Sequence, residues 1–286
     1  MNERSIVNTA QHQYWNTVAG PRWVGLGGFV ERRVAAVNDL LLTRSRVAAG
    51  ERVLEIGCGT GATTVHLAEA VGPNGRVVAV DLSEPMLEGA RKRVAESGLG
   101  NITLLPADAQ VHPFAPGEFD LITSRFGVMF FADPFAAFSN LLPAARPGGR
   151  LCFVCWAPLK DNKHWLIPYE VALRHLGPPA PQPPRTPGPL ALSDPDYVRS
   201  ILDTAGFADI GIGRETPTIT GSTPEEEAEH ACIMGPSGRL IDEKKPEEAL
   251  LERIRREMVE AFAVFARGKE LLLPSSVFVV TARSPR

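Results

Sequence analysis

Residues 53–61, VLEIGCGTG, join a short apolar run to a loop in which three glycines alternate with other residues. The run has the length and composition of a buried strand, and residues 63–71 have the periodicity of a helix. Glycine is required where a backbone turns tightly or where a ligand approaches it closely. The stretch therefore predicts a strand, a ligand-binding turn and a helix, which is how the crevice of an open α/β sheet is built.

The same alternation of strands and helices continues along the chain. We expect strands at residues 52–56, 76–80, 101–105, 118–123, 149–156, 210–220 and 277–282, and helices at 63–71, 83–97, 134–145 and 196–205. Because alternating strands and helices form βαβ units, the predicted fold is α/β, a doubly wound, mostly parallel, seven-stranded Rossmann-like sheet.

The segments outside this pattern are mainly helical. Residues 1–50 predict an N-terminal helical lid, with a short helix, a break at the glycines and Pro21, and a longer helix from about Phe29. The α/β domain then spans 51–286 and carries two inserts, 157–197 and 221–274. The first contains a proline-rich stretch, 177–190, expected to be an extended surface loop, and the second contains helices at 224–234 and 246–266.

Composition limits the classes of partner. The chain has 286 residues, a net charge of −3 and a pI of about 6.1, which give no general attraction for nucleic acid or an anionic membrane. The N-terminus has no apolar signal segment and no run is apolar for about 18 residues. We therefore expect a cytoplasmic protein with reduced cysteines, no nucleic-acid or membrane partner, and an oligomeric state, such as a homodimer, that the sequence leaves open.

Two carboxylates accompany the glycine loop. The loop has the spacing GxGxG rather than the GxGxxG of dinucleotide sites, and Glu55 before it suits a cationic amino group better than a phosphate. Asp81 ends the second predicted strand, where a carboxylate can accept hydrogen bonds from two ribose hydroxyls. Leu82 and Met86 follow and can flank a flat base. Asp81 could instead cap a helix, but Ser83 is the better cap.

These residues resemble those of class I S-adenosylmethionine (SAM)-dependent methyltransferases, in the small-molecule group typified by ubiquinone and menaquinone biosynthesis. The resemblance is firm over about residues 51–156 and rests on motifs in the family's order. They are the glycine loop with Asp81, Ala107-Asp108-Ala109, EFDLI at 118–122 and RPGGRL at 146–151. Residues 124–131, SRFGVMFF, are similar to a subgroup that also carries Tyr14-Trp15-Asn16 and Arg22-Trp23.

The resemblance implies SAM as cofactor and assigns its contacts residue by residue. Gly57, Gly59 and Gly61, with Cys58 inside the loop, would cradle the methionine part, next to Glu55. Asp81 would hold the ribose, and Asp108 and Ala109 the adenine edge. Arg125 and Phe126 would line the floor beneath the sulfonium, and Tyr14 and Trp23 would belong to the lid.

Other polar and aromatic residues have plainer interpretations. Asp108 could be a turn residue, and Tyr14, Trp15 and Trp23 could be core packing. Cys152 and Cys155 form a CxxC pair, but residues three apart in a strand point to opposite faces, so we expect buried packing and no metal. His164, expected near the end of the fifth strand, is the candidate general base. Residues 225–229, EEEAE, are expected to form a solvated helix face.

The predicted function is methyl transfer from SAM to a small, partly apolar metabolite by in-line displacement. Because the sulfonium already activates the methyl group, no catalytic triad is required. The main alternative is a SAM-binding protein with non-methyl chemistry or none. A nucleotide-dependent oxidoreductase is disfavoured by the glycine spacing, and an RNA methyltransferase by the acidic charge and the lack of a basic stripe.

Overall fold

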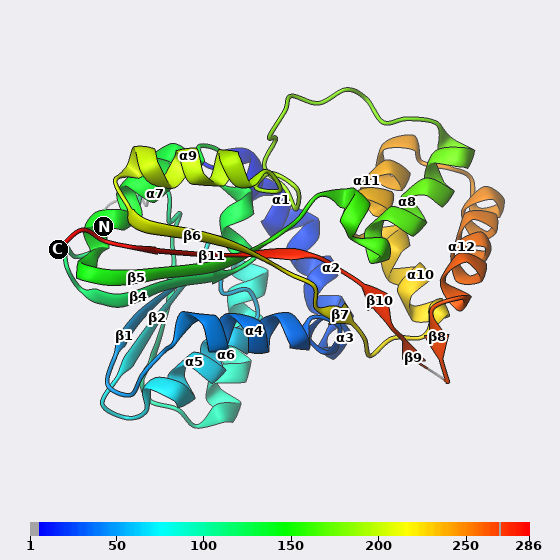
Figure 1. Ribbon diagram of the computed structural model, residues 1–286. Coiled ribbons are helices and arrows are strands. Elements are labelled where there is room, and N and C mark those ends of the chain that lie inside the picture. Colours follow the sequence, from blue (N-terminus) through cyan, green and yellow to red (C-terminus); the bar gives the residue numbers. More distant parts are fainter. Residues whose placement is uncertain (1–5, 269) are drawn as a thin grey trace.

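Seven strands form one sheet in the computed structural model, which describes residues 6–268 and 270–286 (Figure 1). They are β1 (Arg52–Ile56), β2 (Arg76–Asp81), β3 (Ile102–Pro106), β4 (Phe119–Arg125), β5 (Ala145–Trp156), β6 (Ala208–Glu215) and β11 (Val277–Arg283). Their order is β3-β2-β1-β4-β5-β11-β6; β11 is antiparallel to β5 and β6, and the other neighbours are parallel. The predicted fold class is confirmed. The order reverses between β1 and β4, which is where such sheets bind ligands.

Helices cover both faces of the sheet. In Figure 1, α7 (Pro134–Leu141) and α9 (Pro195–Ala205) lie on one face and α4 (Ala35–Ser45) on the other. The remaining helices of the predicted units are α5 (Ala62–Val71) and α6 (Glu84–Ser97), which pack on β2 and β3. The helix expected at 134–145 is shorter, since α7 gives way to the 3₁₀ turn η2 (Leu142–Ala144), which contains Pro143.

The N-terminal segment contains four helices rather than the two expected. They are α1 (Thr9–Thr17), α2 (Ala19–Leu26), α3 (Gly28–Arg33) and α4. The break predicted at Gly20 and Pro21 lies instead at Val18, because Pro21 is in the first turn of α2, where a missing N–H costs nothing. Gly27, at φ +51°, ends α2, so one break does lie at a glycine, as predicted. The first five residues of the predicted lid lie outside the described residues.

Four further helices form a lobe beside the sheet (Figure 1). They are α8 (Lys163–Leu176), α10 (Pro224–Ile233), α11 (Gly235–Lys244) and α12 (Glu248–Ala263). Sequence reasoning missed α8 and α11, because Pro168 lies inside the first and glycines and Pro236 interrupt the second. Residues 177–190 contain no helix or strand, as expected.

Short strands connect the lobe to the sheet. The strand predicted at 210–220 divides into β6 and β7 (Thr218–Ile219), and β7 pairs with β10 (Leu273–Pro274) in a separate ribbon. A second pair is formed by β8 (Ala266–Arg267) and β9 (Glu270–Leu271). Pro217, at the division, cannot donate to a strand ladder, which explains the interruption.

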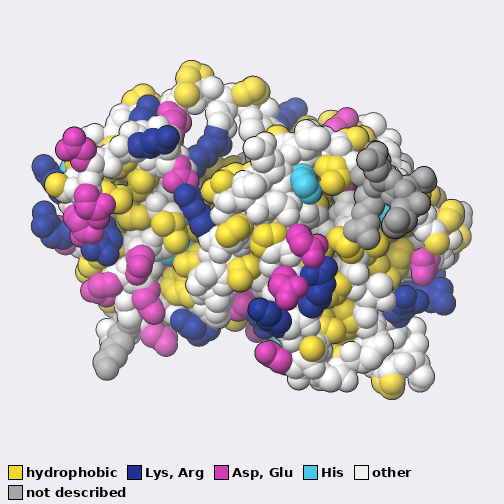
Figure 2. Space-filling model, turned by 180° about the vertical axis from the view of Figure 1, so that it is seen from behind, with side chains coloured by type: hydrophobic (Ala, Val, Ile, Leu, Met, Phe, Trp, Pro, Cys, Tyr) yellow, Lys and Arg dark blue, Asp and Glu magenta, His cyan; other side chains and the backbone are white. Residues whose placement is uncertain are grey.

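Two features of the structure concern possible partners: the distribution of surface charge and the length of the apolar helices. On the face shown in Figure 2, Lys and Arg side chains are interspersed with Asp and Glu rather than gathered in one basic patch. Within residues 6–268 and 270–286, no helix has both the length and the apolarity needed to cross a membrane.

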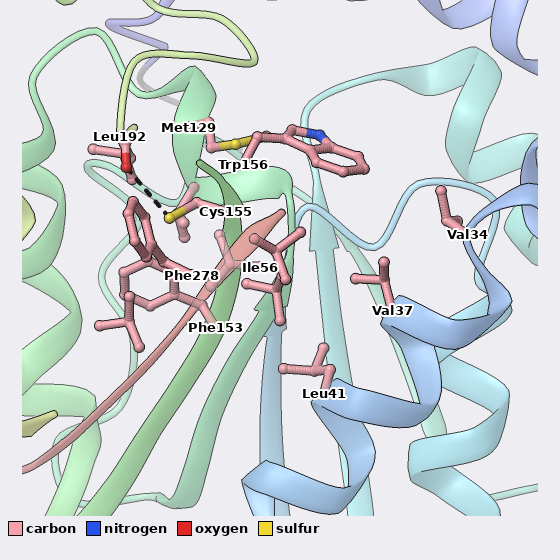
Figure 3. Packing of buried hydrophobic residues seen from close by; sticks show 14 of the residues in the cluster. Val34, Val37, Leu41, Ile56, Met129, Phe153, Cys155, Trp156, Leu192 and Phe278 are labelled. Atoms are coloured by element: carbon pink, nitrogen blue, oxygen red, sulfur yellow. Dashed lines mark hydrogen bonds between the residues drawn. The ribbon is translucent and has the colours of Figure 1, made fainter. Parts of the chain in front are cut away.

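The core joins the N-terminal helices to the sheet. Val37 and Leu41 of α4 are fully buried and point toward the sheet, where Ile56 ends β1 (Figure 3). Trp156 lies at the carboxyl end of β5 with its indole directed toward Val34 (Figure 3). Because this packing fixes α4 against the strand ends, the segment that precedes α4 is held above the glycine loop.

Candidate functional site

The glycine loop adopts a conformation that side chains rarely allow. Gly57, Gly59 and Gly61 have φ values of +69°, +56° and +79°. The N–H groups of Gly57 and Cys58 both donate to the carbonyl of Val80, at 2.8 and 3.0 Å, so the loop wraps around the end of β2. A Cβ on Gly57 would lie 2.6 Å from the Cα of Gly127, beyond β4. The three glycines are therefore required by backbone shape and close approach.

Asp81 is tied to this loop. Its Oδ2 accepts a hydrogen bond from the Gly59 N–H at 2.8 Å, and its Oδ1 accepts one from the Ser83 N–H at 2.9 Å. A carboxylate has about four acceptor sites, so each oxygen retains capacity for a ribose hydroxyl. Burial raises the pKa of Asp81, against the lowering effect of these bonds. Ser83, as expected, caps α6 by accepting from the Met86 N–H.

A charged cluster lies beside the loop. Glu55 is 1% exposed and accepts a hydrogen bond from the Thr64 hydroxyl at 2.5 Å. Burial raises the pKa of Glu55 to about 7, although the Thr64 bond and the charge of Arg125 oppose the shift. Arg125 pairs with Glu31 of α3 at 3.0 Å, and Glu31 also accepts from the Thr60 hydroxyl at 3.4 Å. This mixture of acids and one guanidinium complements a zwitterionic amino acid.

Sequence reasoning missed Glu31, which is 94 residues from its partner Arg125. Only the folded arrangement, in which α3 lies beside the loop, brings Glu31 close to Glu55 and Arg125. In the sequence, Glu31 is simply an acidic residue in a predicted lid helix, and nothing there indicates that Arg125 is its partner.

The two residues expected to flank the base lie at the start of α6. A Cβ on Gly59 would lie 3.1 Å from the terminal methyl of Met86, so Met86 covers the loop. The carbonyl of Leu82 accepts from the Asn16 side-chain amide at 3.1 Å, and Asn16 in turn accepts from the Glu84 N–H at 2.9 Å. Asn16 therefore docks α1 onto the start of α6.

Asp108 is occupied by the N-terminal segment. Its carboxylate accepts from the backbone N–H groups of Val7, Asn8 and Gln110 at 2.9 to 3.1 Å, and from the Asn8 side chain at 2.6 Å. Asp108 is 2% exposed and Ala109 6%. With four donors, the carboxylate is saturated in this arrangement. A contact between Asp108 and an adenine would require Asn8 to move, so the adenine role stays a prediction.

The lid aromatics differ in how far they reach the core. Tyr14 is 43% exposed and places its ring edge against Trp15. Trp15 packs edge-on against Phe130 at 5.1 Å and against Trp23 at 6.2 Å, and its carbonyl accepts from the Ser83 hydroxyl. Phe130 belongs to the 3₁₀ turn η1 (Gly127–Phe130) after β4. Of the three, Trp15 is the one that contacts both another lid ring and the turn after β4.

A row of aromatic rings extends away from the loop. Phe126 follows β4 in the left-handed region at φ +68°, and its ring stacks on Trp156 at 4.3 Å and 7°. Trp156 contacts the rings of Trp165 and His164 at 4.8 and 4.9 Å. His164 was expected near the end of the fifth strand, but it lies on α8 after the 3₁₀ turn η3 (Leu159–Asp161). The helix was hidden in the sequence by Pro168.

Ion pairs connect the N-terminal helices to the lobe. Arg33 of α3 and Glu227 of α10 are both buried, and the Arg33 Nε lies 2.9 Å from each carboxylate oxygen. The Ser222 hydroxyl also donates to Glu227, at 3.1 Å. The expectation that residues 225–229 form a solvated face was therefore wrong at Glu227, because Arg33 compensates its charge. Arg22 and Asp242 form a second, more exposed pair.

The remaining candidates are structural. Cys152 and Cys155 are buried, free and packed on β5, and Cys155 donates weakly to the Leu192 carbonyl (Figure 3). Among the described residues, no group of His, Cys, Asp and Glu side chains could hold a metal ion. An open hollow of about 530 Å³ lies on α4 between Ala36 and Arg46 and contains none of the predicted site residues.

The region around the glycine loop is similar to known methyltransferases. Residues 53–149 match the family model described as a methyltransferase domain. Aklanonic acid methyltransferase of Streptomyces sp. (strain C5) is 40% identical over 113 residues, which are 40% of this chain and 51% of that protein. The ubiquinone/menaquinone biosynthesis C-methyltransferase of Saccharophagus degradans is 42% identical over 108 residues, 37% of this chain and 43% of that protein. The chain spans about half the length, or less, of these relatives.

Solved structures show the same fold. The YcgJ protein of Bacillus subtilis superposes with a TM-score of 0.56 at 18% identity, over 87% of this chain and 98% of that one. The likeness therefore extends beyond the segment that the sequence relatives share.

Proposed function

We propose that this chain is a class I SAM-dependent methyltransferase that transfers a methyl group from SAM to a small, partly apolar acceptor. The match of residues 53–149 to a methyltransferase domain and the two sequence relatives support the proposal. One observation carries the proposal. Asp81 ends β2, accepts from the Gly59 N–H at 2.8 Å and retains acceptor capacity at the carboxyl ends of the strands, beside the switch between β1 and β4 where such sheets bind ligands. A nucleoside with two free ribose hydroxyls fits this arrangement.

The charged side chains beside the loop support SAM, which carries an amino acid, over other nucleosides. We propose that the glycine loop, with Cys58 inside it, cradles the methionine part, whose ammonium would approach Glu55 and Glu31 and whose carboxylate would approach Arg125. Leu82 and Met86 would flank the adenine, and Asp108 and Ala109 would read its edge. Phe126 would lie beneath the sulfonium, with Tyr14 and Trp23 in the lid.

Bound SAM would supply a methyl group already activated by the adjacent positive sulfur. The protein then has to position the acceptor and exclude water, and positioning alone can lower a barrier by roughly 7–11 kcal/mol. Residues 1–50, together with the inserts at 157–197 and 221–274, would enclose the acceptor. Two relatives named for aklanonic acid and for quinone biosynthesis support a small acceptor with an apolar ring system.

Other aspects of the function remain predictions. The mixed surface charge in Figure 2 supports an enzyme that acts without nucleic acid. A cytoplasmic location and a homodimer are proposals of the same kind, to be tested by fractionation of cells and by sedimentation of the intact protein.

The proposal is tested by turnover. The intact protein would be incubated with SAM carrying a deuterated methyl group and a panel of small aromatic and quinone acceptors, and the products analysed by mass. We expect one acceptor class to gain a single deuterated methyl group while the demethylated cofactor accumulates. SAM that binds without methyl transfer to any acceptor would favour a SAM-binding protein with other chemistry, and a protein that does not bind SAM would overturn both.

A further inference from the structure

His164 is an exception among the buried polar side chains of its surroundings. It is 1% exposed, and neither Nδ1 nor Nε2 has a hydrogen-bond partner within the described part of the chain. Arg33, whose charge acts on His164, is by contrast bonded to Glu227, which also accepts from the Ser222 hydroxyl. A buried polar group left without a partner loses the hydrogen bonds that it made to water in the unfolded chain. A ligand bound beside His164 could supply the hydrogen bond that its two ring nitrogens lack.

The position of His164 connects it to the proposed cofactor loop. Gly57 of the loop packs directly on Gly127. The preceding residue, Phe126, stacks on Trp156, and Trp156 contacts the His164 ring. Phe126 is held at φ +68°, a strained backbone for a bulky residue, and such strain collects at binding sites. The row therefore runs without interruption from the loop to the helical lobe.

The charges around His164 are balanced. Arg33 is held by both oxygens of Glu227, so neither charge is free to pair with a ligand. Burial, followed by the charges of Arg33 and His230, keeps the pKa of His164 well below its usual range. The imidazole is therefore neutral, with one donor and one acceptor nitrogen. Such a group recognises an uncharged polar group, and the rings of Trp156 and Trp165 beside it favour a flat apolar body.

We propose that His164 is an acceptor-binding residue that recognises the uncharged hydroxyl group of a flat aromatic acceptor packed against Trp156. The inference rests on the proposed function and specifies its acceptor. In this role His164 accepts a hydrogen bond from the hydroxyl and orients it. The general-base role expected from the sequence would require the imidazole to hold a proton, which its surroundings oppose.

A pair of probes tests the proposal without knowledge of the natural acceptor. Naphthol and its methyl ether, methoxynaphthalene, are titrated into the intact protein with and without S-adenosylhomocysteine, and tryptophan fluorescence is followed. We expect naphthol to bind about tenfold more tightly than the ether, as one hydrogen bond would give. In His164→Phe the two should bind equally. His175→Phe, the same change at a half-buried histidine of α8 that lies against Glu257 rather than Trp156, should leave the ratio unchanged.

A second measurement uses the wild-type protein, so it does not depend on whether a variant folds. In protein with isotope-labelled histidine, naphthol should shift the ring nitrogen resonances of His164, and the ether should not. Equal binding of the two probes, or unmoved His164 resonances when naphthol binds, would overturn the proposal. Calorimetry with S-adenosylhomocysteine on the same samples separates this failure from loss of the cofactor site, which would overturn the proposed function instead.

Discussion

The three glycines of residues 57–61 all have positive φ values, which L side chains rarely adopt. Gly57 has a positive φ, and a Cβ there would collide with the backbone of Gly127. Gly57→Ala should destabilise the protein by about 1–3 kcal/mol and weaken SAM binding. Gly100→Ala is the matched control, because a Cβ at Gly100 meets nothing within 4 Å. Denaturant unfolding of both variants checks the difference, and equal stability would contradict the account of the loop.

Glu55 predicts a dependence of stability on pH. Its pKa is raised to about 7 in the folded protein, so between its ordinary value and 7 the folded state holds a proton that the unfolded state has lost. Its contribution to stability is therefore fully present below the ordinary pKa and is lost as the pH rises through 7. Glu55→Gln should remove this loss, which is on the order of 3 kcal/mol.

The measurement is denaturant unfolding of wild type and Glu55→Gln at about pH 5 and about pH 8. The variant should gain stability relative to wild type at the higher pH. A difference that stays constant between the two pH values would show that Glu55 titrates normally.

Residue roles near the strand ends could be predicted, whereas those that depend on distant partners could not. The positions of Glu55, Asp81 and Ser83 follow from their places in a strand–turn–helix unit. Asn8 and Glu31 escaped prediction because their partners, Asp108 and Arg125, are about a hundred residues away in the chain. His164 was noticed, but its location on a helix was not.

At the scale of elements, the N-terminal helices are bound to the proposed cofactor site at several points. The docking contacts are those of Asn8 with Asp108, Asn16 with Leu82 and Glu84, and Trp15 with Ser83. Removal of residues 1–25 should therefore lower SAM affinity at least about tenfold while the sheet still folds. Titration of the truncated protein, with circular dichroism to confirm folding, provides the check. Unchanged affinity would show that these helices are no part of the cofactor site.

The two ion pairs between the N-terminal helices and the lobe should differ strongly in energy. Arg33→Met leaves the buried Glu227 carboxylate without a compensating positive charge and should cost about 3–5 kcal/mol. The double variant Arg33→Met with Glu227→Met should recover most of this loss. Arg22→Met breaks an exposed pair and should cost at most about 1 kcal/mol. Equal costs in denaturant unfolding would contradict the burial of the Arg33 pair.

Prediction of whole elements followed periodicity and failed where it was interrupted. The strands and helices of residues 51–156 were predicted in the right order and place, because short apolar runs and helical periodicity mark them. Of their ends, β5 begins at Ala145 rather than at 149, and α7 ends at Leu141 rather than at 145. In α8 and α11, proline and glycine mask helices that tertiary packing nevertheless stabilises. The strand at 210–220 divides because Pro217 cannot continue the ladder.

For the whole molecule, the α/β sheet carries the glycine loop, and the helical lobe lies beside the sheet. The sheet order was implied by alternating elements and by the family resemblance, whereas the packing of the lobe against α2 and α3 depends on contacts such as Arg33 with Glu227. We propose that SAM binds at the carboxyl ends of β1 and β4 through Asp81.

Calorimetric titration with SAM and S-adenosylhomocysteine, beside Asp81→Ala, tests this claim most directly. Loss of two hydrogen bonds to a carboxylate should weaken binding by about a hundredfold or more. Asp203→Ala, a change of an exposed carboxylate on α9, should bind as wild type does. Micromolar binding that is lost only in Asp81→Ala is the predicted result. Folded wild-type protein that binds neither compound would contradict the account.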